Sequence, residues 1–339
     1  MRNTNPNTLR RSILALVLAA GGAVPLYASA AEPELLNVSY DVARELYKEI
    51  NPAFIASYKQ QSGQTVEIKQ SHGGSSKQAR AVADGLEASV VTMNQANDID
   101  MLADRGLVAK DWAKKFPNNA APYYSTMVFL VRKGNPKQVR DWQDLARPGV
   151  AVIIPNPKTA GNGRYTYLGA WGSVIKKGGN ETQARDLVSK IFKNVPILDG
   201  GGRAATTTFT QRQIGDVLVT FENEVSMVRK EFGNNFEVVY PTSSILAESP
   251  VAVVDKVVDR KKLRQPATAY LNFLYSPAGQ EIGAKHYMRV RSDAVMKKYA
   301  ANYKPISLFT VDEVFGGWRA AQKRHFDDGG EFDKIYTAK

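Results

Sequence analysis

The chain alternates short apolar runs with longer segments of helical periodicity, and this alternation constrains its fold more than any other feature. It occurs three times before residue 106. The apolar runs are 35–40, 65–70 and 88–94, and the helical segments that follow them are 42–58, 75–85 and 99–105. Strands that alternate with helices are typical of βαβ units and a mostly parallel sheet.

The same pattern starts again after the turn-rich stretch 117–122, which predicts a second α/β unit. Strands are predicted at 126–132, 150–154, 195–198, 216–221, 236–240 and 251–254. Helices are predicted at 164–176, 181–193, 263–275, 277–287 and 311–326. We therefore expect an α/β protein with two lobes, each a mostly parallel sheet flanked by helices.

The 339-residue length suits two domains, but the chain has no low-complexity linker between them. We expect the chain to leave the first lobe near Tyr123 and to return near Leu246. These two hinge crossings give a first lobe of residues 31–122 plus 246–339 and a second lobe of 123–245. Such paired crossings permit closure over a ligand. Two sequential domains divided near Pro122 remain the alternative.

Residues 1–30 have the pattern of a secretory signal peptide. Arginines at positions 2, 10 and 11 precede the uncharged apolar run 13–27, and Ala28-Ser29-Ala30 supplies the small-x-small cleavage pattern. We expect export and cleavage near Ala30. An uncleaved membrane anchor is the alternative, although Gly21, Gly22 and Pro25 disfavour a spanning helix.

The positive charge of the chain is dispersed. The formal net charge is +12, and three of these charges belong to the signal peptide, which leaves +9. The densest basic run, 260–264, contains no aromatic residue, unlike a groove for single-stranded nucleic acid. We expect no nucleic-acid partner. The chain also has no cysteine, which excludes a disulfide framework.

The sequence lacks the common patterns of catalytic and metal sites. His72, His286 and His325 are widely spaced, and neither a phosphate-binding loop pattern nor a nucleophile elbow occurs. We therefore expect a protein that is not an enzyme and that needs no cofactor and no metal.

Small residues gather where predicted strands end. Four such clusters occur, at 39–41, 71–76, 158–163 and 199–203. Ligands of open α/β sheets bind outside the carboxyl ends of the strands, and the N-terminus of a following helix attracts anions. The sequence therefore predicts a site for a small anion, although each cluster alone is also explained as a capped helix or a loop.

Two side chains in these clusters have local interpretations. Ser75 and Gln78 match a capping box, so the Ser75 side chain is expected to cap its own helix while its backbone N–H points outward. Asp41 fits the N-cap of the helix predicted from Val42 better than a ligand contact.

Several segments carry a resemblance to a known family. They are 35–41, 70–79, 129–137, 155–159, 214–218 and 314–318. Together they resemble the bacterial periplasmic sulfate- and thiosulfate-binding proteins over nearly the whole chain after the signal peptide.

The resemblance implies a type II periplasmic binding protein, with two lobes, that acts as a monomer. It would capture sulfate or thiosulfate between the lobes and deliver it to the permease subunits of an inner-membrane ABC transporter. The residues that match the family's anion donors are Ser75, Gly161, Asn162 and Gly202, acting through their main chains. Asp41 and Arg203 match supporting positions.

Two positions depart from the sulfate-binding pattern. Ala160 stands where the family has a serine hydroxyl, and Phe221 stands where the sulfate-binding members have a tryptophan. Phe221 is similar to the thiosulfate-binding branch, whereas Ala160 fits neither branch.

A site made only of hydrogen-bond donors is expected to reject protonated phosphate. A binder of molybdate or phosphate, and an exported hydrolase of phosphate or sulfate esters, remain alternatives.

Overall fold

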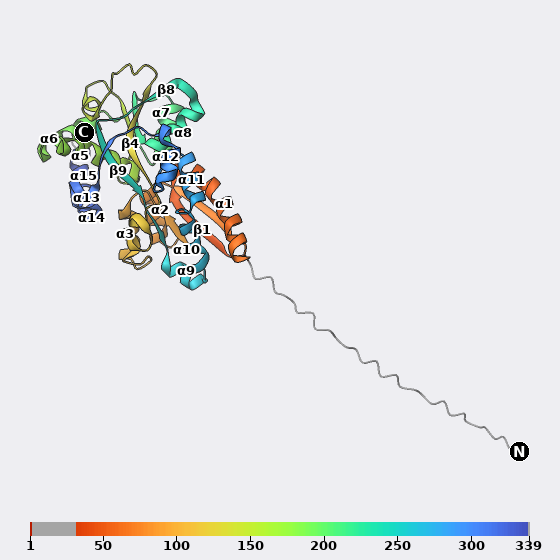
Figure 1. Ribbon diagram of the computed structural model, residues 1–339. Helices are drawn as coiled ribbons and strands as arrows, with labels where there is room; N and C mark the ends of the chain where they lie inside the picture. Colours follow the sequence, from red (N-terminus) through yellow and green to blue (C-terminus); the bar gives the residue numbers. More distant parts are fainter. Residues whose placement is uncertain (2–31, 338–339) are drawn as a thin grey trace. The chain divides into compact units, whose positions relative to one another are not determined.

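The computed structural model describes residues 32–337, together with Met1. The predicted signal peptide and its cleavage site near Ala30 otherwise lie outside the described residues. Within this part of the chain, no helix is long and apolar enough to cross a membrane. Helices surround two separate sheets (Figure 1).

The first sheet has the strand order β2-β1-β3-β10. Its strands are β1 (Glu34–Tyr40), β2 (Glu67–Gly73), β3 (Val90–Thr92) and β10 (Val251–Val253). β1 pairs in parallel with β2 and β3, so that Val38 lies between Ser71 and Val91, and β10 pairs antiparallel with β3. The helices that follow its parallel strands are α1 (Arg44–Ser62), α2 (Ser75–Ala83) and α3 (Ala96–Asp104).

The second sheet has the strand order β12-β9-β4-β7-β5-β6, and β8 and β11 also pair with β4. Its strands are β4 (Tyr123–Arg132), β5 (Val152–Pro155), β6 (Leu198–Asp199), β7 (Val217–Phe221), β8 (Phe236–Val239), β9 (Ser243–Ser249), β11 (Arg289–Val290) and β12 (Ser307–Phe309). β5 is parallel to β6 and β7, whereas β4 is antiparallel to β7.

The two sheets contain the same local arrangement. β2-β1-β3-β10 and β6-β5-β7-β4 each consist of three parallel strands in the order second, first, third, followed by an antiparallel strand. In this order the direction of winding reverses beside the first strand, and ligands of such sheets bind at the carboxyl ends of the strands there. Each sheet therefore has one edge suited to a ligand.

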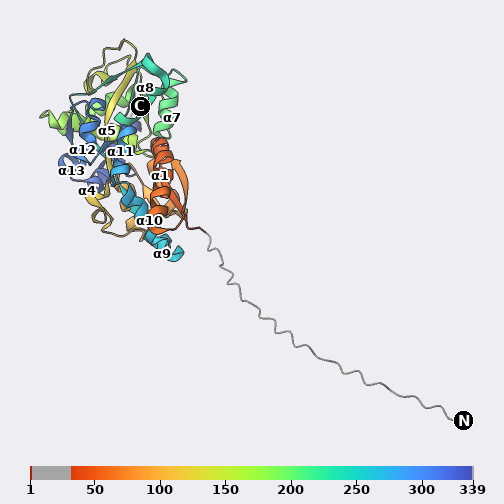
Figure 2. The ribbon, with the colours of Figure 1, turned by 45° about the vertical axis from the view of Figure 1, so that its right-hand side comes forward.

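The remaining helices cover the sheets. They are α4 (Pro117–Ala120), α5 (Gly161–Lys176), α6 (Glu181–Lys193), α7 (Gly202–Thr210), α8 (Glu222–Phe232), α9 (Asp255–Lys261), α10 (Arg264–Phe273), α11 (Pro277–Lys285), α12 (Asp293–Lys298), α13 (Val311–Phe315), α14 (Trp318–Ala321) and α15 (Glu331–Thr337). α10 packs against α1, and both views show them together (Figures 1 and 2).

Most predicted elements are confirmed, but others were not predicted. Among them are the strands β9, β11 and β12 and the helices α7, α8, α9, α12 and α15. In addition, α5 begins at Gly161 rather than at Arg164. The single helix predicted at 311–326 is interrupted, because Gly316 and Gly317 adopt positive φ angles of 71° and 95° that end α13.

The C-terminal segment belongs with the second sheet. β12 pairs in parallel with β9, and α15 packs against α6 with Phe332 5.3 Å from Phe192 between ring centroids. Lys158 fixes the same segment, because its Nζ donates to the carbonyl oxygen of Phe326 and to Asp333 at 2.9 Å each. These contacts place residues 307–337 beside the second sheet, whereas the lobe bounds 31–122 plus 246–339 and 123–245 stay a prediction.

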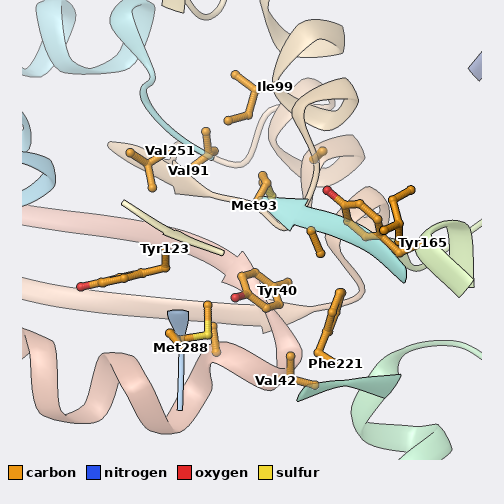
Figure 3. Packing of buried hydrophobic residues seen from close by; sticks show 14 of the residues in the cluster. Tyr40, Val42, Val91, Met93, Ile99, Tyr123, Tyr165, Phe221, Val251 and Met288 are labelled. Carbon is orange, nitrogen blue, oxygen red and sulfur yellow. The ribbon is translucent and has the colours of Figure 1, made fainter. Parts of the chain in front are cut away.

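One hydrophobic core cluster contains residues from both sheets. Tyr40 and Val42 enter it from the end of β1 and Phe221 from the end of β7, and Figure 3 shows them in this part of the core with Tyr165 of α5. The ends of the two sets of strands are therefore packed against each other.

Candidate functional site

The buried N-termini of α2, α5 and α7 lack a side-chain cap, as does that of α8. α2, α5 and α7 follow the N-cap residues Gly74, Ala160 and Gly201, and none of the three helices has a side-chain cap hydrogen bond. The first N–H groups of an α-helix have no partner within the helix and need an acceptor when they are buried. Ser75 and Asn162 are only 1% and 2% exposed. These termini therefore present N–H donors away from water.

The three N-termini converge on one place. A Cβ atom at Gly74 would lie 2.7 Å from the carbonyl oxygen of Thr159, which precedes α5, and 3.0 Å from that of Gly200, which precedes α7. A Cβ atom at Gly201 would lie 3.8 Å from the Gly74 Cα. Since α2 follows the first sheet and α5 and α7 follow strands of the second, the carboxyl ends of the two sheets face each other here.

Ser75 lies at this point, but the expected capping box is wrong. Ser75 is the first residue of α2 rather than its N-cap. Its Oγ donates to Asp98 Oδ2 at 2.5 Å, and the Gln78 side chain donates to Ser71 Oγ at 2.8 Å instead of returning to the N-cap. The buried carboxylate of Asp98 competes for the hydroxyl, so the helix terminus stays open.

At the start of α5 the main chain rather than the side chain of Asn162 is available. Asn162 Nδ2 donates to Thr220 Oγ1 at 3.0 Å, and its Oδ1 accepts from Thr166 Oγ1 at 3.5 Å. Gly161 is required by close packing, because a Cβ atom there would lie 2.0 Å from Asn94 Oδ1. Ala160 is 2% exposed and, as the N-cap, brings no polar side chain.

Gly202 begins α7, and Asp41 closes part of that terminus from the first sheet. Asp41 Oδ2 accepts from the Arg203 N–H at 3.0 Å, and Oδ1 accepts from the Val42 N–H at 3.0 Å. The expected N-cap role in its own helix is wrong, because α1 begins after Ala43. Burial raises the pKa of the Asp41 carboxyl, and the two backbone hydrogen bonds oppose this shift.

Arg203 is directed toward Glu224 of α8. Its Nη1 lies 3.8 Å from Glu224 Oε1, to which Thr206 Oγ1 also donates at 3.0 Å. Burial raises the pKa of Glu224 to about 7, opposed by the charge of Arg203 and reinforced by that of Asp41. Arg203 and Glu224 both lie on the second-sheet side of the site. The positive charge of the Arg203 guanidinium is therefore directed toward the buried Glu224 carboxylate.

Phe221 supplies an apolar surface near the donors. It is the last residue of β7 and is 3% exposed, and its ring lies edge-on to Tyr165 at 5.9 Å (Figure 3). An aromatic edge or face offers no hydrogen-bond donor comparable to an indole N–H.

The sequence did not single out three residues that the structure brings to the site. Asn94 follows β3 and contacts Gly161, and Asp98 pairs with Arg164 of α5 at 3.8 Å, both ions being nearly buried. Burial lowers the pKa of Arg164. Of these three residues, Asn94 alone had a signal in the sequence, because it directly follows a short apolar run and so a predicted strand end.

His72 lies at the end of β2, near the start of α2. His72 Nδ1 lies 3.3 Å from the Tyr40 carbonyl oxygen, and burial lowers the pKa of this imidazole to about 4. In residues 32–337 no three His, Asp or Glu side chains are grouped as metal ligands.

Residues 36–289 match a family described as bacterial extracellular solute-binding protein. The chain is 59% identical over 331 residues to the thiosulfate-binding protein of Pseudomonas aeruginosa, covering 97% of this chain and 99% of the relative. It is 55% identical over 304 residues to the sulfate-binding protein of Escherichia coli, covering 89% and 92%.

A solved structure gives the same result for the fold. The sulfate-binding protein SubI from Mycobacterium tuberculosis superposes with a TM-score of 0.79 at 33% sequence identity. The match covers 87% of this chain and all of that chain.

Proposed function

The chain belongs to the family of bacterial extracellular solute-binding proteins, with their two-lobed type II fold, and we propose that it binds thiosulfate or sulfate between its two sheets. The names of the relatives support this ligand class. The observation that carries the proposal is the convergence of the uncapped N-termini of α2, α5 and α7 around Gly74. Each terminus adds N–H donors and a partial positive charge.

The donors of this site are Ser75, Gly161, Asn162 and Gly202, acting through backbone N–H groups. Hydrogen bonds to a charged acceptor contribute about 1.5 to 3 kcal/mol each, so four of them suffice for binding without a directly paired cation. Arg203 and Arg164 are engaged by Glu224 and Asp98 instead.

Selectivity follows from the scarcity of acceptors. Sulfate and thiosulfate carry no proton at neutral pH, whereas phosphate carries one or two and needs an acceptor for each. The carboxylates of Asp41 and Asp98 already accept hydrogen bonds, Asp41 from the Arg203 and Val42 N–H groups and Asp98 from Ser75 Oγ. A protonated phosphate oxygen would therefore face a further donor, which is unfavourable. Phe221 suits the less polar terminal sulfur of thiosulfate.

Capture is followed by transfer rather than by a chemical step. The two halves of the site lie on different sheets, so opening between them would release the anion. In this proposal the lobes are joined near Tyr123 and Leu246, and the chain is exported to the periplasm after cleavage near Ala30. There it acts as a monomer and presents the anion to the permease subunits of an inner-membrane ABC transporter.

Calorimetric titration of ligand-free protein with thiosulfate, sulfate, molybdate and phosphate at pH 7 tests the proposal. We expect micromolar or tighter binding of thiosulfate or sulfate and no comparable binding of phosphate. Failure of both sulfur anions to bind would refute it, and turnover of a chromogenic sulfate or phosphate ester would favour an enzyme instead. Gly202→Asp places a carboxylate at the first residue of α7, where it would repel the anion. We expect this variant to fold but not to bind.

A further inference from the structure

Asn94 is a buried amide whose carbonyl oxygen has no hydrogen-bond partner among the described residues. The residue is 5% exposed, and its Oδ1 is buried without a hydrogen bond to any described residue. A buried amide group left unpaired costs about 1 to 3 kcal/mol. The adjacent Gln95 is 0% exposed and also has a buried Oε1 without a partner, but its Nε2 donates to Ser76 Oγ at 2.9 Å.

The position of Asn94 directs this amide into the candidate site. Its backbone N–H donates to Ser75 Oγ at 3.3 Å, which fixes the residue at the start of α2. Its carboxamide lies over the first residue of α5, since a Cβ atom at Gly161 would be 2.0, 2.8 and 3.1 Å from Asn94 Oδ1, Cγ and Nδ2. The carboxamide is therefore held between two of the three open N-termini.

The N-cap residue of α5, Ala160, has no polar side chain, so a hydrogen-bonding side chain at this terminus has to come from a neighbouring element. Ala160 provides no side-chain hydrogen bond, and the Asn162 amide is already engaged by Thr220 and Thr166. The Asn94 carboxamide is the polar side-chain group that packs on Gly161 itself. A rotation of 180° about its last torsion exchanges Oδ1 and Nδ2 in nearly the same volume.

We propose that Asn94 is a direct ligand contact whose Nδ2–H donates to the bound oxyanion beside the N-terminus of α5. This inference rests on the proposed function and adds one side-chain donor to its backbone donors. An unprotonated sulfate or thiosulfate offers only acceptors, so it selects the rotamer that presents Nδ2. The amide thereby supplies the side-chain donor that Ala160 cannot.

The test compares Asn94→Ala with Gln95→Ala by calorimetric titration of thiosulfate and sulfate. We expect Asn94→Ala to weaken the preferred anion about ten- to a hundred-fold, as for loss of one hydrogen bond to a charged group. Gln95→Ala removes a neighbouring buried amide that faces Ser76, and we expect it to change affinity less than about twofold. Thermal unfolding without ligand shows that both variants are folded.

A rescue experiment separates contact from support. In the Asn94→Ala background, Ala160→Ser places a hydroxyl at the N-cap of α5 and should restore at least part of the lost affinity. The gain in anion affinity from Ala160→Ser should be larger in the Asn94→Ala protein than in the unsubstituted protein. A purely structural role of Asn94 predicts the same gain in both.

The outcomes distinguish this inference from the proposed function. Unchanged affinity of Asn94→Ala beside a tightly binding unsubstituted protein overturns the contact and leaves the proposed function intact. Tighter sulfate binding with loss of hydrogenphosphate binding in Asn94→Ala overturns it too, because the carbonyl oxygen would then face the ligand. If the unsubstituted protein binds neither sulfur anion, the proposed function fails and the inference fails with it.

Discussion

α5 and α6 are consecutive helices that begin in opposite ways. α6 starts with a complete capping box, in which Asn180 Oδ1 accepts from the Gln183 N–H at 3.0 Å and Gln183 Oε1 accepts from the Asn180 N–H at 2.9 Å. α5 starts after Ala160 with no such bond and with its first turn buried. The difference teaches that a helix whose first N–H groups are paired by its own cap needs no ligand. A helix whose first N–H groups are buried without a cap needs an acceptor from outside the helix.

The largest effect is expected where a methyl group would separate the open termini. Gly74→Ala places a Cβ 2.7 Å from the carbonyl oxygen of Thr159, in the loop between β5 and α5. We expect about a hundred-fold loss of anion affinity with little loss of stability of the open protein. Gly200→Ala is the matched control, since a Cβ there meets no atom within 4 Å. Equal effects of the two substitutions in calorimetry would show that the contact does not matter.

The next effect concerns stability in the presence of the anion. An acceptor that satisfies the open termini binds only the folded protein, and at a free concentration one hundred times Kd it adds about 2.7 kcal/mol to the free energy of unfolding. Urea unfolding with thiosulfate or sulfate, compared with chloride at the same ionic strength, measures this increment. An equal response to chloride would contradict an oxyanion site.

Acidic residues extend the comparison between the two kinds of terminus. Glu181 in the first turn of α6 is 52% exposed and accepts from Arg324, whereas Glu224 beneath the open end of α7 is buried and has a pKa of about 7. Because the folded pKa lies above the usual value of 4.5, the folded state binds the proton more tightly than the unfolded state. The stability gained in this way is present in acid and is lost as the pH rises through 7.

Glu224→Gln tests this pH dependence. A change of one in pKa corresponds to about 1.4 kcal/mol, so we expect the stability of the unsubstituted protein relative to Glu224→Gln to fall by on the order of 2 kcal/mol between pH 5 and pH 8. Chemical unfolding at a series of pH values measures it. A difference that is flat or rises with pH would mean that burial does not raise the pKa of Glu224.

The smallest effect is expected at the capped terminus. Asn180→Ala removes the α6 cap, and we expect it to lower the free energy of unfolding by about 1 kcal/mol without changing anion affinity. Urea unfolding and titration of the same variant check both parts. A loss of affinity in this variant would remove the distinction between the two helix termini.

Much of the fold could be predicted from the sequence, because the hydrophobic periodicity of a helix or strand depends only on neighbouring residues. The strand at 35–40 and the helix at 181–193 were predicted close to their observed bounds. β9 was missed because Ser243–Ser249 mixes polar and apolar residues and is held as a strand by β4 and β12. α5 was predicted to begin late because Gly161 and Gly163 disfavour helices, yet a Cβ at Gly163 would lie 2.3 Å from the Pro155 carbonyl oxygen.

The site was predictable where a helix start was visible and not where a partner came from far away in the chain. Ser75 and Gly202 follow glycine clusters that mark the starts of α2 and α7. The contacts of Asp41 with Arg203 and of Asn94 with Gly161 join the two sheets, and no local pattern encodes them. For the same reason the capping role given to Ser75 was wrong, because Asp98 lies 23 residues away.

Amide chemical shifts test the central claim most directly, because an N–H that donates to an anion moves its proton signal downfield. In a deuterated, nitrogen-labelled sample titrated with thiosulfate or sulfate, we predict the largest downfield shifts at Ser75, Gly161, Asn162 and Gly202. The Gln183 amide in the first turn of α6 should keep its shift because it already donates to Asn180 Oδ1. Saturable binding without shifts at the starts of α2, α5 and α7 would contradict the account.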